Sequence, residues 1–122
     1  MTKNANIVFG VKRDYEKEGV YINAEKRLHL STPLVDSNMP DDWEVLVEIS
    51  KRLGERIEYK TSEDVFNDVT KEVKRFKYAT YERLKKRPLS WPITKEGDTP
   101  ILHIKEFSTN DKKCIFIFIL MN

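Results

Sequence analysis

The sequence is poor in the side chains that build covalent crosslinks and soft-metal sites. It contains one cysteine, Cys114, and two histidines, His29 and His103, among 122 residues. A single cysteine excludes a disulfide within the chain and any site that needs several cysteine ligands. Because the two histidines are far apart in sequence, a zinc site is poorly supplied as well. We therefore assign no metal-ligating residue to this chain.

The sequence also lacks a large charge excess and a long apolar segment. Its 22 basic and 20 acidic residues give a net charge of +2, which is too balanced to indicate nucleic-acid binding by itself. The longest apolar run, residues 114–121, is too short to span a bilayer. Residues 1–6 are too polar for a secretory signal. These features predict a soluble, cytoplasmic chain that does not enter a membrane.

The first helix is predicted over residues 41–53, directly after Pro40. An aspartate at its start can accept hydrogen bonds from the free N–H groups of the first turn. Gly54 is suited to end the helix in a left-handed cap. The apolar face of this helix should be formed by Trp43, Leu46, Val47 and Leu53, widened by Val45 and Ile49.

The second helix is predicted over residues 61–77, where apolar side chains recur with the 3.6-residue helical period. Thr61 or Ser62 can cap its start, and Thr61 and Asp64 have the approximate spacing of a capping box. A short third helix is expected over residues 80–86, before Pro88.

Strand signals are shorter. Residues 7–9 are predicted to form a short buried strand, and residues 20–30 to form a loop with one or two short strands. Trp43 and Trp91 are expected to anchor the core. Together these elements predict a mixed α/β fold with two main amphipathic helices, a short third helix and short strands.

Several sequence motifs follow one another in a recognisable order. Residues 16–27 read E-K-E-G-V-Y-I-N-A-E-K-R, and D-D-W-E-V-L-V begins at Asp41. Further on come K-R-L-G at 51–54, Y-E-R-L at 81–84, L-S-W-P at 89–92 and G-D-T-P-I-L-H at 97–103. In this order, they resemble one internal segment of the large molybdopterin oxidoreductases, and within them the catalytic (alpha) subunit of formate dehydrogenase.

The resemblance implies that residues 1–122 form a single partial domain that flanks the cofactor of a much longer enzyme. In that family, a molybdenum or tungsten ion held by molybdopterin guanine dinucleotide takes two electrons from a substrate such as formate, which becomes carbon dioxide. The family's iron–sulfur cluster needs four cysteines, so this chain cannot bind it. We expect the isolated chain to have no catalytic residue and no oxidoreductase activity of its own.

The end of the sequence departs from the family pattern. Residues 114–122 form an atypical apolar tail where the family continues into a long final domain. Residues 5–10 also lack the acid and the proline that usually stand there. We therefore expect a split subunit, or a fragment that arose by truncation or frame shift.

Three residues are candidates for cofactor binding. Lys17 matches the lysine of the E-K-E-G motif, and the resemblance implies that it contacts the guanine dinucleotide cofactor. Asp41 or Asp42 matches the acid before the helix tryptophan, where a carboxylate can accept two N–H bonds from the edge of guanine. Each has a plainer alternative: Lys17 as a solvated loop charge, and the aspartates as an N-cap.

The rest of the opening motif is expected to serve the fold. Gly19 is a candidate for a positive-φ turn, and Asn23 can bridge backbone groups of the loop. Glu25 and Arg27 are spaced so that they can form an ion pair.

Three functions remain open for the chain. The first is a fragment or split subunit of a formate dehydrogenase-like oxidoreductase, with the remaining parts of that enzyme as partners. The second is a non-enzymatic accessory or remnant module that packs on a partner subunit or on a second copy through exposed apolar faces. The third is a small basic nucleic-acid-binding domain. It would use Lys71, Lys74, Arg75, Lys77, Arg83, Lys85, Lys86 and Arg87. The same basic residues are more simply explained as the solvated faces of two amphipathic helices, and we favour that interpretation.

Overall fold

The computed structural model describes residues 2–116, so the tail predicted over residues 114–122 lies outside the described residues from 117 onward. The described part contains three α-helices and a three-stranded antiparallel sheet of order β1-β2-β3, which confirms the predicted mixed α/β fold. The elements, with short 3-10 turns marked η, are η1 (Thr2–Asn4), η2 (Asp14–Glu16), β1 (Gly19–Ile22), β2 (Arg27–Ser31), α1 (Asp42–Arg52), α2 (Ser62–Glu72), η3 (Lys74–Phe76), α3 (Tyr81–Lys86) and β3 (Leu89–Ser90).

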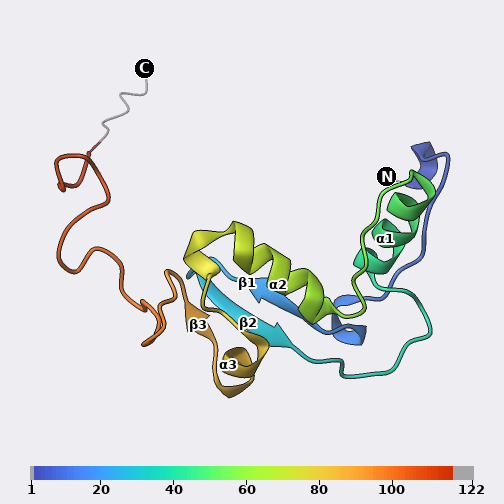
Figure 1. Cartoon of the computed structure of the whole chain (residues 1–122), viewed down its shortest axis with the longest axis horizontal. Helices are drawn as coiled ribbons and strands as arrows, with labels where there is room; N and C mark the ends of the chain where they lie inside the picture. The colour runs from blue at the N-terminus through green and yellow to red at the C-terminus, as the bar shows by residue number, and fades with distance from the viewer. Residues whose placement is uncertain (1, 117–122) are drawn as a thin grey trace.

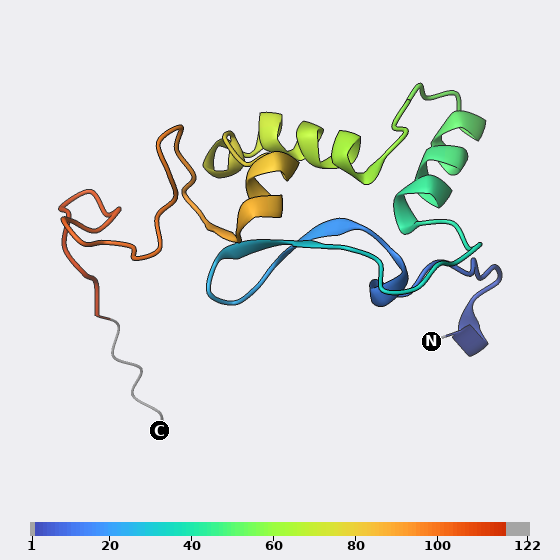
Figure 2. The same cartoon turned by 90° about the horizontal axis from the view of Figure 1, so that it is seen from below.

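The elements follow one another along an elongated molecule (Figure 1). The N-terminal segment and α1 lie at one end, the β1–β2 hairpin with α2 and α3 lies in the middle, and residues 101–116 extend from the other end. Seen from below, α2 and α3 cover the same side of the β1–β2 ribbon (Figure 2). Only the middle part therefore has the layered arrangement that can enclose a core.

The β1–β2 hairpin confirms the strands predicted over residues 20–30, and its turn is organised by Asn23. The Asn23 side-chain oxygen accepts hydrogen bonds from the N–H groups of Glu25 and Arg27, each at 3.0 Å, as the sequence predicts. Two other predictions for this motif are wrong. Gly19 lies in extended strand β1 and not in a positive-φ turn, and no ion pair joins Glu25 to Arg27 within residues 2–116.

The core lies between the hairpin and the two helices above it. Leu28 of β2 has no exposed surface and packs in one cluster with side chains of α2 and α3. Trp91 packs against this cluster, as predicted, whereas Trp43 is not part of it, which corrects its assignment as a core anchor. The buried members of the cluster are Leu28, Phe66, Ala79, Tyr81, Leu84, Leu89 and Ile93.

Helix α1 lies where predicted, with Asp41 and Leu53 as its capping residues, but it does not have the predicted packing. Gly54 ends it with a φ of 91°, which confirms the left-handed cap. Its apolar face is largely uncovered, because Leu46 is 65% and Leu53 is 77% exposed, and Val47 is its one buried residue. Helical periodicity requires an apolar face but does not say which polypeptide covers it.

Helix α2 begins as predicted and ends earlier. The Thr61 hydroxyl accepts from the Asp64 N–H at 3.1 Å, and the Asp64 carboxylate accepts from the Thr61 N–H at 2.9 Å. The helix stops at Glu72 and not at residue 77, because Val73 adopts an extended backbone. The following turn, η3, places Phe76 against the core. The third helix is confirmed, with the Thr80 hydroxyl accepting from the Arg83 N–H.

The strand predicted over residues 7–9 is wrong. These residues form no regular structure, and Ile7, Val8 and Phe9 are all more than half exposed. They lie before Lys12, whose N–H donates to the Pro40 carbonyl at 2.9 Å. A three-residue apolar run shows no periodicity, and a strand also needs a free sheet edge beside it.

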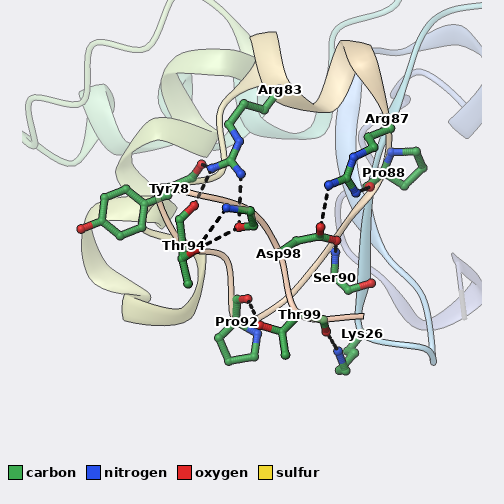
Figure 3. Close-up of polar contacts among 11 residues, drawn as sticks. Lys26, Tyr78, Arg83, Arg87, Pro88, Ser90, Pro92, Thr94, Asp98 and Thr99 are labelled. Carbon is green, nitrogen blue, oxygen red and sulfur yellow. Dashed lines mark hydrogen bonds and ion pairs between the residues drawn. The ribbon is translucent and has the colours of Figure 1, made fainter. Parts of the chain in front are cut away.

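A single arginine ties α3 to the loops on either side of it (Figure 3). The Arg83 guanidinium donates to the carbonyls of Tyr78 at 2.7 Å, Thr94 at 2.8 Å and Gly97 at 3.2 Å. A planar guanidinium has five N–H donors and can bind three separate carbonyl groups at once. A lysine ammonium carries its donors on one nitrogen and cannot reproduce this geometry.

Asp98 forms a second link in this region. Its carboxylate accepts from Arg87 at 2.6 Å and from the Ser90 N–H at 2.8 Å, and its side chain is only 9% exposed. The Arg87 guanidinium, together with the Ser90 N–H, holds the pKa of Asp98 below its usual value of 3.8.

We expect Asp98→Asn to lower the free energy of unfolding at pH 7 by about 1–2 kcal/mol. Because the pKa of Asp98 is lower in the folded than in the unfolded chain, its stabilisation is complete above about pH 4 and is lost as the pH falls through the folded value. Urea unfolding at a series of pH values should show that the free energy of unfolding of Asp98→Asn is lower than that of the original chain, and that this difference shrinks below about pH 4. The exposed Asp36→Asn is the matched control, and a deficit of Asp98→Asn that does not change with pH would contradict this account.

Candidate functional site

The three residues that the sequence nominates for cofactor binding lie together in the structure. Lys17 follows η2, and Asp41 and Asp42 stand at the start of α1. The Lys17 ammonium donates to the Asp42 carboxylate and lies 3.6 Å from the carboxylate of Asp14. Segments 25 residues apart are thereby joined at one place.

The ion pair sets the charge state of Lys17. Its side chain is 16% exposed, and the hydrogen bond to Asp42 raises the pKa of the ammonium, although burial acts in the opposite direction. Lys17 is therefore a charged, paired residue and not a freely solvated loop lysine.

Asp41 is the N-cap residue of α1, and its carboxylate is incompletely paired. Its backbone N–H donates to the Glu44 carboxylate at 2.7 Å, which fixes the first turn of the helix. Its Oδ2 accepts from the Lys12 ammonium at 3.2 Å. The side chain is placed toward the Glu44 N–H as in a capping box, but Oδ1 is buried and forms no hydrogen bond. A buried acceptor without a partner is rare in folded proteins and calls for a physical explanation.

Trp43, two residues further on, carries an unpaired hydrogen-bond donor, which complements the unpaired acceptor of Asp41. Its indole Nε1 is buried and also without a partner. An unpaired N–H donor and an unpaired carboxylate oxygen thus occur within the first turn of one helix.

These residues line a groove of about 360 Å³, which is within the size range of small-molecule sites. Its polar wall contains Lys17, Asp41 and Asp42, together with Trp43. The rest of the lining comes from Glu18 and the adjoining β1, from α2 and from η3. It comprises Glu18, Gly19, Val20, Tyr21, Ile22, Ser62, Val65, Phe66, Val69 and Phe76.

A chain of hydrogen bonds connects the groove to the core. The buried Tyr81 hydroxyl donates to Ser62 at 3.2 Å, and the Ser62 hydroxyl donates to the Glu18 carboxylate at 3.5 Å. Burial raises the pKa of Tyr81, so its hydroxyl stays protonated at neutral pH. The relay fixes Glu18 on the groove wall.

Sequence reasoning had not assigned Trp43, Ser62 or Glu18 to the site. The sequence predicts Trp43 as a core anchor, whereas the structure places it in the groove lining with Asp41 and Asp42. Ser62 and Glu18 are 44 residues apart in sequence, and no local pattern connects them.

A larger groove of about 830 Å³ lies on another side of α1, between that helix and the N-terminal segment. Lys12 is in its lining, but none of the three nominated residues is. Its other lining residues are Phe9, Ser37, Asn38, Met39, Pro40, Glu44, Val45, Glu48, Ile49 and Arg52.

The residues with metal-ligating chemistry are dispersed. Across residues 2–116, no three side chains of histidine, cysteine, aspartate or glutamate are grouped so that they could hold a metal ion. Cys114 is exposed, and His103 stacks on Phe107 with ring centroids 4.8 Å apart. Within the same residues, no helix has the length and apolarity that a membrane span requires.

Comparison with known proteins connects the chain to oxidoreductases. It is 30% identical over 115 residues to the F420-dependent formate dehydrogenase subunit alpha of Methanocaldococcus jannaschii, an alignment that covers 89% of this chain and 17% of that protein. It is 32% identical over 102 residues to the F420-dependent formate dehydrogenase 1 subunit alpha of Methanococcus maripaludis, covering 79% of this chain and 15% of that protein.

A third relative comes from a bacterium. The probable oxidoreductase YjgC of Bacillus subtilis is 31% identical over 117 residues, which are 91% of this chain and 12% of that protein. No protein-family model matches the chain. The chain therefore spans between 12% and 17% of the length of these relatives, and it is related by sequence to oxidoreductases that include formate dehydrogenase alpha subunits.

Proposed function

We propose that this chain is a cofactor-flanking segment of a formate dehydrogenase-like molybdopterin oxidoreductase, and that its groove binds the guanine end of the cofactor. Two independent observations support the proposal. The relatives are named as formate dehydrogenase subunits and an oxidoreductase. The three residues nominated from the sequence line one groove, although they come from different segments.

The unpaired groups of the groove fit the edge of a guanine base. Guanine offers two adjacent N–H donors and a carbonyl acceptor, whereas Asp41 Oδ1 is a buried acceptor and Trp43 Nε1 a buried donor without partners. Pairing with a base requires both side chains to turn these buried atoms toward the groove, and it then removes the desolvation penalty that the atoms carry. This is the single observation on which the proposal rests most heavily.

The charges of the groove favour the base over the phosphates. Lys17 is already paired with Asp42 and lies near Asp14, so its positive charge is neutralised inside the protein. A phosphate oxygen can reach the ammonium only by competing with Asp42. We therefore propose that the aspartates bind the base. Lys17 lies at the rim of the site, where its ammonium exchanges the Asp42 carboxylate for a phosphate oxygen when the nucleotide binds.

The chain supplies only part of the chemistry of the whole enzyme. When bound, the pterin-held molybdenum or tungsten ion supplies the two-electron redox chemistry. The residues of this chain bind and orient the nucleotide end, and the buried Phe66 and the half-buried Trp43 on the groove wall exclude water from it. The segment alone should be inactive as an oxidoreductase.

The exposed apolar side chains support the proposal that the remaining parts of the enzyme are partners of this chain. Leu46 and Leu53 on α1, and Phe9 before it, are all more than half exposed. Large apolar side chains that gather on an exposed surface often mark a site where further polypeptide packs. We propose that the remaining parts of the enzyme pack there, and the alternative role, an accessory module on a partner subunit, would use the same surface.

Binding of guanosine monophosphate (GMP) to the purified chain tests the proposal. We expect isothermal titration calorimetry to detect GMP and to give at least about tenfold weaker binding of AMP, because adenine lacks the paired N–H donors of guanine. Asp41→Asn should weaken GMP binding by a similar factor, since an amide oxygen is a weaker acceptor than a carboxylate. Asp36→Asn is the matched control and should bind like the original chain.

Lys17→Ala tests binding of the phosphate separately from binding of the base. It should weaken binding of GMP while leaving guanosine, which has no phosphate, nearly unchanged. Equal binding of GMP and AMP, or no effect of Asp41→Asn, would reject the guanine assignment.

A further inference from the structure

Four exposed cations gather at the end of α2 that is remote from its capped start. Lys74, Arg75 and Lys77 belong to η3 and the residue after it, and Lys95 comes from the loop that follows Trp91. These four residues are called the basic surface below. A backbone hydrogen bond from the Ile93 N–H to the Arg75 carbonyl, at 3.0 Å, joins the two segments.

Three of the four cations of the basic surface lie over aromatic rings. Arg75 lies 4.7 Å from the centre of the Trp91 ring, and Lys77 and Lys95 lie 5.6 Å and 5.9 Å from the centre of the Tyr78 ring. No ion pair within residues 2–116 includes any of the four. By contrast, other exposed cations of the same region, such as Lys71 and Lys86, are paired.

The arrangement is fixed by the fold. Arg83 holds the carbonyls of Tyr78 and Thr94, so the tyrosine and the residue before Lys95 are tied to one guanidinium. The Tyr78 ring points away from that guanidinium (Figure 3). Attraction to the negative end of α2 accounts for a cation near its last turn, but not for Lys95, which reaches the same ring from another loop. Lys77 and Lys95 are therefore brought to the same aromatic ring, and neither forms an ion pair within residues 2–116.

We infer that the basic surface is a docking site for an acidic segment of a protein partner. This inference is independent of the proposed cofactor groove, because none of the four cations lines it. Ammonium and guanidinium groups spread over two loops match several separate carboxylates. Nucleic acid fits less well, since bases stack on open aromatic faces and the Tyr78 and Trp91 rings already carry cations.

A fluorescein-labelled oligoglutamate peptide is the probe for this site. Anisotropy of the full chain with the peptide should show binding that weakens as salt is raised. The double variant Lys77→Gln/Lys95→Gln should bind at least about tenfold more weakly. The matched control Lys51→Gln/Lys60→Gln removes the same charge from exposed positions outside this region and should retain binding. In NMR spectra, the peptide should shift the indole N–H signal of Trp91 and leave that of Trp43 in place.

Three results would overturn the inference. If both double variants weakened peptide binding equally, the binding would depend on net charge and not on the basic surface. The absence of peptide binding at low salt would remove the docking site, whatever happens at the cofactor groove. Tighter binding of a single-stranded DNA oligonucleotide than of the peptide, abolished by the same double variant, would assign the surface to nucleic acid instead.

Discussion

Leu28→Ala should lower the free energy of unfolding by about 3 kcal/mol, enough to populate the unfolded chain under native conditions. Leu28 has no exposed surface and lies where β2 meets side chains of α2 and α3. Its truncation leaves a cavity that three different elements would have to fill together. Chemical denaturation followed by circular dichroism measures the loss.

Leu46→Ala is the matched control for this prediction. The same side chain is truncated, but on α1, where Leu46 is 65% exposed. We expect a change of no more than about 0.5 kcal/mol. If the two variants lost similar stability, α1 would contribute to the core as its periodicity suggests, and the described packing would be wrong.

Arg83→Met should lower the free energy of unfolding by about 2–3 kcal/mol. Methionine retains an unbranched apolar side chain but removes every donor, which leaves three carbonyls without the guanidinium they share. Arg83→Lys should recover part of the loss, because one ammonium cannot reproduce the planar fork. Thermal and urea unfolding of the three proteins provide the comparison.

Lys86→Met provides the control on the same helix. Lys86 pairs with Glu82 in an exposed i,i+4 ion pair, which typically contributes about 0.3–0.5 kcal/mol. A stability loss in Arg83→Met no larger than that of Lys86→Met would show that the three carbonyls are equally well served by water.

Local signals in the sequence predicted the helix starts well. The capping box of Thr61 and Asp64 is formed by groups only three residues apart, so nothing distant can change it. The end of α2 was less predictable, because it depends on Phe76 reaching a core made by β2 and α3. A continuous apolar period cannot distinguish a longer helix from a helix followed by a 3-10 turn.

The apolar faces show a second limit of sequence reasoning. Leu46 and Leu53 follow the helical period of α1, yet they are exposed in this chain. Residues 7–9 are also apolar and more than half exposed, although Phe9 lines the larger groove beside α1. Both segments have a composition suited to burial, and their cover would come from other polypeptide in the proposed enzyme.

The candidate site was reached through the family resemblance and not through spacing. Lys17 and Asp42 are 25 residues apart, and only the folded chain shows that they pair. The resemblance nominated the residues, whereas the structure added the groove, the unpaired Asp41 oxygen and the indole of Trp43. These additions depend on burial, which the sequence alone does not specify.

The central claim is that the groove beside Asp41 and Trp43 receives a guanine base. The most direct test is an NMR titration of the ¹⁵N-labelled chain with GMP, because its two tryptophans give two separate indole N–H signals. The claim predicts that the Trp43 signal shifts progressively while the Trp91 signal stays in place. An unchanged Trp43 signal at saturating GMP, or a shift confined to Trp91, would contradict it.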